Sequence, residues 1–148
     1  MSYELVDVTS EGDWRAYHTL RREVLREARG RYNYDDKHAD EYLAANHPLL
    51  LKLNGRPIGT VRLDDLNNGA GAVRLVAIAG DVQRQGHGRM LTVMVESCAR
   101  GLGLKTLFVN AAPEAVGSYE RLQWEYFIWD ETEFVGIAAD CKQMRKEL

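Results

Sequence analysis

The chain has 148 residues, 45% of them hydrophobic and 28% charged, which fits one globular domain over residues 1–148 better than two. Its formal net charge of −3 is far from the basic character of nucleic-acid-binding proteins, so we expect no nucleic-acid partner. No apolar run approaches the ~20 residues that a membrane span needs, and the N-terminal residues carry no secretory pattern, so we expect a cytoplasmic protein with no membrane partner.

The first half of the chain predicts a strand, a helix and three antiparallel strands. Polar and apolar side chains alternate at the start, and apolar side chains then recur at helical spacing until about Gly30, with Arg21 on the polar face of the helix. Further along, the pair Asn54-Gly55 favours a two-residue hairpin turn. The strands are expected at residues 3–8, 48–53, 58–63 and 73–79, the apolar stripe of the helix at 14–28, and a loop or short helix at 31–46.

The second half predicts helices and strands in alternation. Apolar side chains from Leu91 onward mark an amphipathic helix that closes at Gly101 or Gly103, and Pro113 suits the first turn of a short second helix. The expected elements are helices at 91–102 and 113–122 and strands at 106–110, 126–129 and 141–146. Strands in series followed by this alternation predict a mixed α+β fold, in which helices flank a sheet.

The two cysteines and four histidines show no spacing typical of metal ligands, so no metal site is expected. Cys98 falls on the apolar stripe of its helix and Cys141 on the last strand. In a reducing compartment such thiols are commonly buried side chains. We therefore expect neither thiol to carry a covalent intermediate.

The most informative segment is residues 83–89, Gln-Arg-Gln-Gly-His-Gly-Arg, between an expected buried strand and a helix. Gly86 and Gly88 let the backbone approach a ligand, and the helix N-terminus and the flanking arginines add positive charge, which suits a pyrophosphate. A P-loop would need Lys and then Ser or Thr after the last glycine, and a dinucleotide fingerprint would need a small residue in place of Leu91. The alternative is a loop in which the glycines only turn the chain.

The pattern Gln83-x-x-Gly86-x-Gly88 resembles the acyl-CoA pyrophosphate loop of the GNAT superfamily of N-acyltransferases. Residues 110–122, with Asn110 followed by a helix-borne Tyr119, resemble the family's second motif, and the resemblance covers nearly the whole chain. It implies a twisted, mostly antiparallel GNAT-like sheet flanked by helices. It also implies an enzyme that transfers an acetyl or short acyl group from acetyl-CoA to a primary amine of a small molecule or peptide, by direct attack in a ternary complex.

The resemblance further implies roles for individual residues. The backbone of residues 76–78 lines the pantetheine arm, and the N–H of Ile78 binds the thioester carbonyl and then the oxyanion. Tyr119 lies near the sulfur and acts as general acid, while the side chain of His87 points away from the phosphates. The expected cofactor-binding residues are Val76, Ala77, Ile78, Gln83, Arg84, Gln85, Gly86, His87, Gly88, Arg89, Asn110 and Tyr119.

The general base is where the sequence departs from the family. Many members carry a glutamate early on the central strand, but the corresponding stretch here is Val73-Arg74-Leu75. Asp64, Asp65 and His47 are alternative bases, each of which is also a typical surface or turn residue. A chain that has lost turnover and only binds acyl-CoA, as a sensor or regulatory module, is the alternative function, and transfer to a hydroxyl is a third.

The acceptor site is also interpreted from charged and aromatic side chains. Arg62 and Arg74 fall on neighbouring strands, and together with Asp64 they are the candidate substrate residues. If both arginines face the cleft, they favour an acceptor that carries a carboxylate; the alternative is charge pairing with Asp64 or Asp65. Tyr32, Tyr34 and Tyr42 either form a lid or cover the core, and an exposed sheet edge near the last strand makes a homodimer an open alternative.

Overall fold

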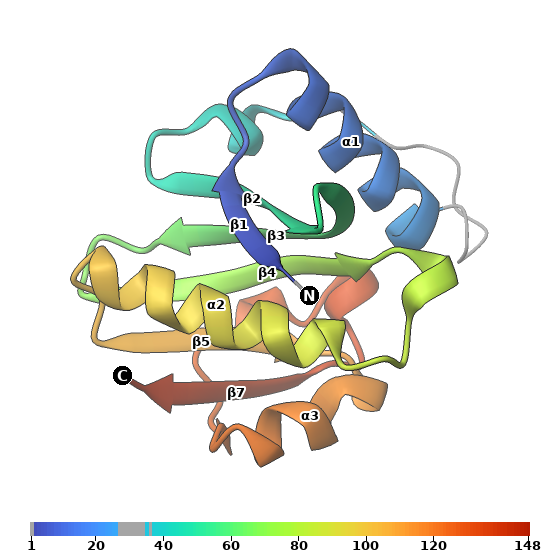
Figure 1. Ribbon diagram of the computed structural model, residues 1–148. Helices are drawn as coiled ribbons and strands as arrows, with labels where there is room; N and C mark the ends of the chain where they lie inside the picture. The colour runs from blue at the N-terminus through green and yellow to red at the C-terminus, as the bar shows by residue number, and fades with distance from the viewer. Residues whose placement is uncertain (1, 27–34, 36) are drawn as a thin grey trace.

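A computed structural model of the chain describes residues 2–26, 35 and 37–148. Seven strands form one sheet in the order β1-β2-β3-β4-β5-β7-β6, in which β4 and β5 pair in parallel and the other neighbours antiparallel (Figure 1). The strands are β1 (Tyr3–Asp7), β2 (Asn46–Leu53), β3 (Arg56–Asp65), β4 (Ala70–Ile78), β5 (Thr106–Ala111), β6 (Glu125–Tyr126) and β7 (Lys142–Glu147). The helices are α1 (Glu11–Arg21), α2 (His87–Gly101) and α3 (Val116–Arg121). The mixed α+β fold with a mostly antiparallel sheet is confirmed.

Three consecutive leucines in β2 show how the sheet separates two apolar layers. Leu49 and Leu51 pack in the larger core with Leu91 and Val95 of α2, whereas Leu50 packs in a second cluster with Tyr17 of α1. Successive side chains of a strand point to opposite faces, so α1 and α2 cover opposite faces of the sheet. Burial on both faces explains why this strand is apolar without alternation.

The structure confirms the expected turn at Asn54-Gly55 and shows how α1 and α3 begin. Asn54 and Gly55 have φ angles of 51° and 83°, as a two-residue primed turn between β2 and β3 requires. The hydroxyl of Ser10 accepts a hydrogen bond from the N–H of Asp13 and caps α1. Pro113 occupies the first turn of a 3₁₀ segment that leads into α3.

One face of α1 differs from the prediction. Arg21 is buried, where it donates a hydrogen bond to the Tyr17 hydroxyl and pairs with Glu41. Its place on a polar face was wrong because Glu41, on a short 3₁₀ turn (Ala39–Tyr42), covers this part of the helix. The expected end of the helix near Gly30 lies outside the described residues, as do Tyr32 and Tyr34.

The C-terminal segment also differs. The expected strand at 126–129 is wrong beyond Tyr126, since β6 has two residues and the backbone N–H groups of Trp129 and Asp130 then donate to the side chain of Gln143. A side chain thus takes the place of a strand partner. Cys141 lies just before β7, not within it.

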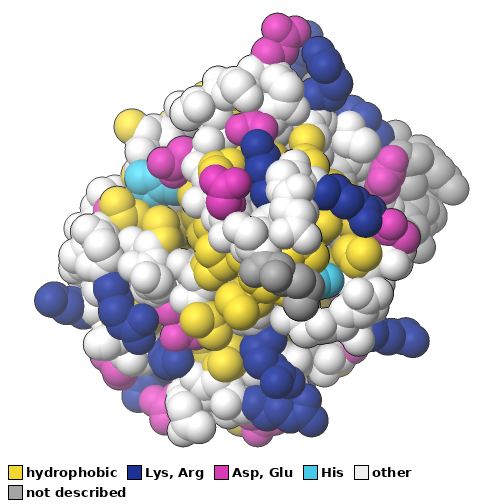
Figure 2. Space-filling model, in the orientation of Figure 1, with side chains coloured by type: hydrophobic (Ala, Val, Ile, Leu, Met, Phe, Trp, Pro, Cys, Tyr) yellow, Lys and Arg dark blue, Asp and Glu magenta, His cyan; other side chains and the backbone are white. Residues whose placement is uncertain are grey.

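The face of the molecule shown in Figure 2 carries side chains of both charges. In the view of Figure 2 hydrophobic side chains gather near the centre of the face that carries α2, and basic and acidic side chains are interspersed around them. None of the helices in the described part of the chain has the length and apolar character needed to cross a membrane.

Candidate active site

The central feature of the site is a split between two neighbouring strands. β4 and β5 pair from Ala70 and Thr106 to Val73 and Val109, and beyond this point they separate. A cavity of about 550 Å³ opens there, lined by both strands, the segment after β5, α3 and the segment before β7. It is therefore a ligand-sized cleft in the middle of the sheet.

A bulge in β4 lies beside this split. The register passes from Thr60 opposite Ala77 to Arg62 opposite Arg74, so β4 holds one residue more than β3 between these pairs. Leu75 takes up the extra length with a φ of 57°, which is unusual for a residue with a side chain. A bulge bends its strand and re-aims the following residues, here 76–78, along the cleft.

The polar backbone groups of Ile78 point away from β3. The N–H of Ala79 donates to the carbonyl of Ile58 at 2.8 Å, and hydrogen-bonded and non-hydrogen-bonded pairs alternate along an antiparallel ladder. The pair of Ile78 with Gly59 is therefore a non-hydrogen-bonded one, and the carbonyl of Ile78 instead accepts a hydrogen bond from Nε2 of Gln83 at 2.9 Å. This is the orientation that an oxyanion donor at Ile78 requires.

Residues 83–86 form the turn that leads into α2. Gly86 precedes the helix with a φ of 88°, and an added Cβ there would meet none of the described atoms within 4 Å. In the described part of the chain no side chain caps the helix, so its first N–H groups remain available to a ligand. Arg84 also has a positive φ, of 63°. The turn thus combines exposed backbone donors, a helix N-terminus and arginine side chains.

His87 is the first residue of α2, and its side chain is buried. Its Nδ1 lies 2.8 Å from the hydroxyl of Tyr3 in β1, and the two rings meet edge to face. The imidazole therefore points toward β1 and fastens the turn to the first strand.

Tyr119 of α3 lines the cavity and is only 6% exposed. Its ring meets the ring of Trp124 edge to face at 5.1 Å. Burial raises the pKa of the Tyr119 phenol to about 12, against a smaller opposite effect of the Thr92 hydroxyl. The phenol is therefore protonated at neutral pH, as a proton donor must be.

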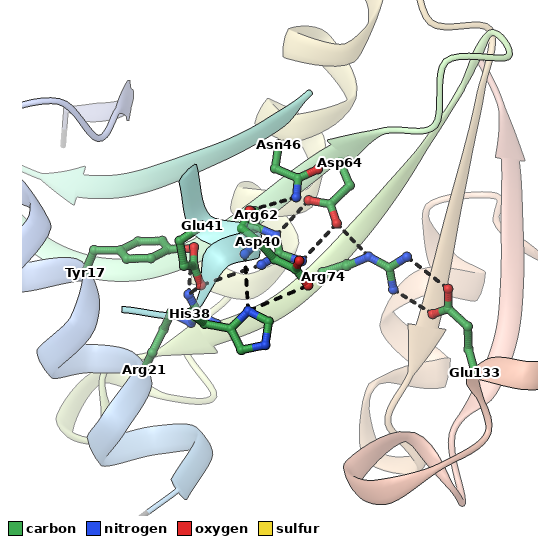
Figure 3. Close-up of polar contacts among 10 residues, drawn as sticks. All are labelled: Tyr17, Arg21, His38, Asp40, Glu41, Asn46, Arg62, Asp64, Arg74 and Glu133. Atoms are coloured by element: carbon green, nitrogen blue, oxygen red, sulfur yellow. Dashed lines mark hydrogen bonds and ion pairs between the residues drawn. The ribbon is translucent and has the colours of Figure 1, made fainter. Parts of the chain in front are cut away.

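Six charged side chains of alternating sign run from α1 to the cavity (Figure 3). Glu133, on a 3₁₀ turn (Glu131–Glu133), accepts two hydrogen bonds from Arg74, at 2.6 and 2.9 Å, and Arg74 donates a third to Asp64 at 2.8 Å. We call the set the charge chain: in order, Glu133, Arg74, Asp64, Arg62, Glu41 and Arg21. Three cations face three anions, so the charge chain is neutral as a whole.

The structure brings the predicted substrate residues together but does not leave them unpaired. Arg62 is buried, donates twice to Asp64 at 2.7 and 2.9 Å, and is not among the described residues that line the cavity. Of the two predicted arginines, Arg74 reaches the cavity, between two carboxylates. The alternative of pairing with Asp64 is confirmed, which removes the argument that free arginines favour an acidic acceptor.

The candidate bases do not reach the cavity. Among the described residues that line it, Asp64, Asp65 and His47 do not occur. Asp64 is held by both arginines, and the carboxylate of Asp65 accepts the N–H of Asn67 in the turn before β4.

Several cavity residues carried no signal in the sequence. Glu133, Asp140 and Cys141 line the cavity from segments without a motif or a periodic pattern. Cys141, expected on the last strand, instead lies beside the cleft and close enough to Tyr119 to raise its pKa, and the expectation that its thiol carries no covalent intermediate stays a prediction. Asn110, the predicted cofactor contact, donates to Glu133 and accepts from Gln143, both at 3.0 Å.

The pair of Arg74 and Glu133 gives a pH-dependent contribution to stability. Hydrogen bonds from Arg74 hold the pKa of Glu133 below its usual value, so the pair stabilises the fold above about pH 4.5 and loses this effect as the pH falls through the lowered pKa. Between pH 6 and pH 3, we expect the free energy of unfolding of the wild type to fall by up to about 1 kcal/mol more than that of Glu133→Gln. Urea unfolding at both pH values measures this, with Glu131→Gln as the control; parallel pH profiles of wild type and Glu133→Gln would contradict it.

No group of three His, Cys, Asp or Glu side chains within the described residues is arranged to hold a metal ion. The expectation that no metal is needed stays a prediction. Tyr42 is 57% exposed and packs against Trp14 of α1, so its role in a lid also stays open.

The chain is similar in sequence and in fold to known acetyltransferases. A family model described as an acetyltransferase (GNAT) domain matches residues 18–148. The fold is similar to that of an acyl-CoA N-acyltransferase from Pseudomonas aeruginosa, with a TM-score of 0.79, 19% identity and 98% of each chain covered. It is also similar to the ribosomal-protein-S18-alanine N-acetyltransferase from Escherichia coli, with a TM-score of 0.72, 16% identity, and 97% of this chain and 91% of the other covered. An acetyltransferase from Bacillus subtilis in complex with CoA matches with a TM-score of 0.68, 16% identity, and 99% and 97% covered.

Proposed function

Because the chain belongs to the GNAT acetyltransferase family and is thus an acyl-CoA-dependent N-acetyltransferase, we propose that it acetylates a primary amine of a small molecule or peptide by direct attack within a ternary complex. The observation that carries the proposal is the cavity at the split of β4 and β5, which Val76 and Tyr119 line, together with the uncapped N-terminus of α2 at the Gly86 turn further along the chain from β4. Acetyl-CoA is the proposed donor, and a longer acyl group is a variant of the same chemistry.

The donor would lie along the exposed edge of β4. The N–H groups at the start of α2, together with Gln83, Arg84, Gln85, Gly88 and Arg89, would surround the pyrophosphate. The backbone of residues 76–78 would then run beside the pantetheine arm. The N–H of Ile78 points to that side of β4, where it can donate to the thioester carbonyl.

The proposed transfer begins with attack of the amine on the thioester. The neutral amine nitrogen bonds to the thioester carbon, and the carbonyl electrons move to the oxygen, whose negative charge the N–H of Ile78 stabilises. The carbonyl re-forms, the carbon–sulfur bond breaks, and the sulfur leaves with the electron pair while Tyr119 donates its proton toward it. The attacking nitrogen gives its surplus proton to water and keeps the other as the amide N–H, and the phenol is reprotonated from solvent.

Titration calorimetry with acetyl-CoA, CoA and pantetheine tests the donor half of the proposal. We expect both CoA forms to bind and pantetheine, which lacks the pyrophosphate, to bind at least about 100-fold more weakly, about 2.7 kcal/mol. Absence of CoA binding would contradict the proposal.

Thioester consumption tests the transfer half. Thioester consumption that depends on an added amine indicates transfer. A protein that binds the thioester and protects it is instead a sensor, an alternative that rests on the arginine at position 74, where many family members carry a glutamate. Direct attack also requires that Cys141→Ala retain turnover, and loss of turnover with normal CoA binding would favour a covalent route through that thiol.

A further inference from the structure

Glu133 joins the two strands at the point where they separate. The last paired residues of β4 and β5 are Val73 and Val109, and the next residues are Arg74 and Asn110. Arg74 donates to both carboxylate oxygens of Glu133, and Nδ2 of Asn110 donates to Oε1 at 3.0 Å. At the first position of the split a carboxylate, in place of a backbone hydrogen bond, thus connects the strands.

The orientation of this carboxylate is fixed by two side chains, Arg74 and Asn110, each of which is itself held by other residues. The guanidinium of Arg74 is itself held by Asp64, and it lies 5.8 Å from the ring of Trp129. The amide of Asn110 is held by Gln143, which fixes its Nδ2 toward Glu133. Glu133 is therefore preorganised, and a fixed group in a cleft recognises a ligand at a lower cost in entropy than a mobile one.

The carboxylate can still accept a further hydrogen bond from a ligand. An ionised carboxylate offers about four acceptor positions, of which Arg74 uses two and Asn110 uses one. The remaining position is on Oε2, and the Glu133 side chain, which is 22% exposed, is among those that line the cavity. An N–H donor in the cavity can therefore reach the carboxylate while Arg74 and Asn110 remain bound.

The charge chain has an anion at its cavity end. Arg74 shares its positive charge between Asp64 and Glu133, and Arg62 and Arg21 balance the anions deeper in the protein. Arg74 also lines the cavity, but among the described residues of the lining it stands against three carboxylates, those of Glu114, Glu133 and Asp140, so this end is acidic overall. A neutral or cationic amine suits this end, and a carboxylate on the acceptor does not.

We propose that Glu133 binds the N–H groups of the acceptor amine at the split and stabilises the positive charge that forms on its nitrogen during attack. The inference rests on the proposed function and deepens it, because it assigns the acceptor side of the cleft to a residue outside the central strand. The carboxylate missing from residues 73–75 is thereby supplied by another element, which Arg74 holds in place. The acceptor class follows as primary amines without a negative charge close to the reacting nitrogen.

The test compares Glu133→Gln with the neighbouring Glu131→Gln. The first substitution keeps a side chain of similar size with acceptor and donor atoms but removes the charge, while Glu131 is an exposed residue of the same 3₁₀ turn. The probes are butylamine, 1,4-diaminobutane and 4-aminobutanoate, three primary amines with the same carbon spacing. Binding of each to the CoA complex is measured by calorimetry, the KM of each by thioester consumption, and folding by thermal unfolding.

We expect Glu133→Gln to raise the KM of butylamine and 1,4-diaminobutane at least about 10-fold, a loss of about 1.4 kcal/mol, with the Kd of CoA within about twofold of wild type. We also expect wild type to prefer both to 4-aminobutanoate, and Glu133→Gln to lose this preference. Glu131→Gln should behave as wild type, and Glu133→Asp should recover part of the amine affinity.

Two results would overturn the role of Glu133 alone: amine KM values unchanged in Glu133→Gln, or a parallel loss of CoA affinity, which indicates that the residue only holds the strands. A wild-type protein that binds CoA but neither binds nor acetylates any of the amines would overturn the proposed function together with this inference.

Discussion

Gly86→Glu is expected to weaken binding of CoA and acetyl-CoA at least about 100-fold, a loss of about 2.7 kcal/mol. Two effects add. Gly86 has a φ of 88°, where a residue with a side chain is strained by roughly 1–2 kcal/mol, so the turn before α2 would shift. The new carboxylate would also stand at the helix N-terminus where the proposal places the pyrophosphate, and it would repel that group. Titration calorimetry measures the affinity of the variant for CoA and for acetyl-CoA.

Two variants separate these effects. Gly86→Lys brings the same strain with the opposite charge, so it should bind more tightly than Gly86→Glu. Gly103→Glu brings a carboxylate to another glycine with positive φ, 80°, after the C-terminal end of α2, and it should bind as wild type does. Wild-type affinity in Gly86→Glu would contradict the assignment of this turn to the pyrophosphate.

Tyr119→Phe is expected to lower turnover about 100-fold while the affinity for CoA stays within about twofold. General acid catalysis commonly contributes about 10²–10⁴-fold. Burial that raises the pKa of Tyr119 to about 12 keeps the phenol protonated but also makes it a weak acid, which is why we expect the lower end of this range. Steady-state kinetics at saturating acetyl-CoA measure the loss.

The exposed Tyr126 of β6 provides the matched control, since Tyr126→Phe removes the same atom from a residue that does not line the cavity. Because the pKa of Tyr119 is near 12, turnover should show no loss from phenol ionisation up to about pH 10. Unchanged turnover in Tyr119→Phe, or a basic limb near pH 9 that the variant abolishes, would refute the role.

Sequence signals of short range predicted the frame of the site well. The Asn54-Gly55 turn and the succession of strands and helices along the chain depend on neighbouring residues, and both are confirmed. The helix expected at 91–102 is confirmed as α2, but it begins earlier, at His87. The backbone geometry at Ile78 could be expected from the family resemblance alone, since its orientation follows from a bulge at Leu75 that has no local signal.

Contacts between distant segments could not be predicted in the same way. Arg74 and Glu133 are 59 positions apart, and Arg21 and Glu41 come from segments whose spacing gives no indication that they meet. A charged residue in an amphipathic pattern is typical of an exposed position, so Arg21 was placed on the surface. The segment of Glu133 leaves the sheet because Gln143 binds its backbone, a long-range contact that no periodicity records.

The hydrogen bond between Tyr3 and His87 couples the first strand to the turn that begins α2. β1 is an edge strand paired with β2 alone among the described strands, and edge strands open at a lower free energy than the centre of a sheet. Opening of β1 would release His87 from its hydrogen bond. If CoA binds only when the turn before α2 is closed, bound CoA stabilises the closed state by mass action and makes opening of β1 rarer. Amide protons of β1 should then exchange with deuterium more slowly in the presence of CoA, although the strand lies outside the proposed donor site.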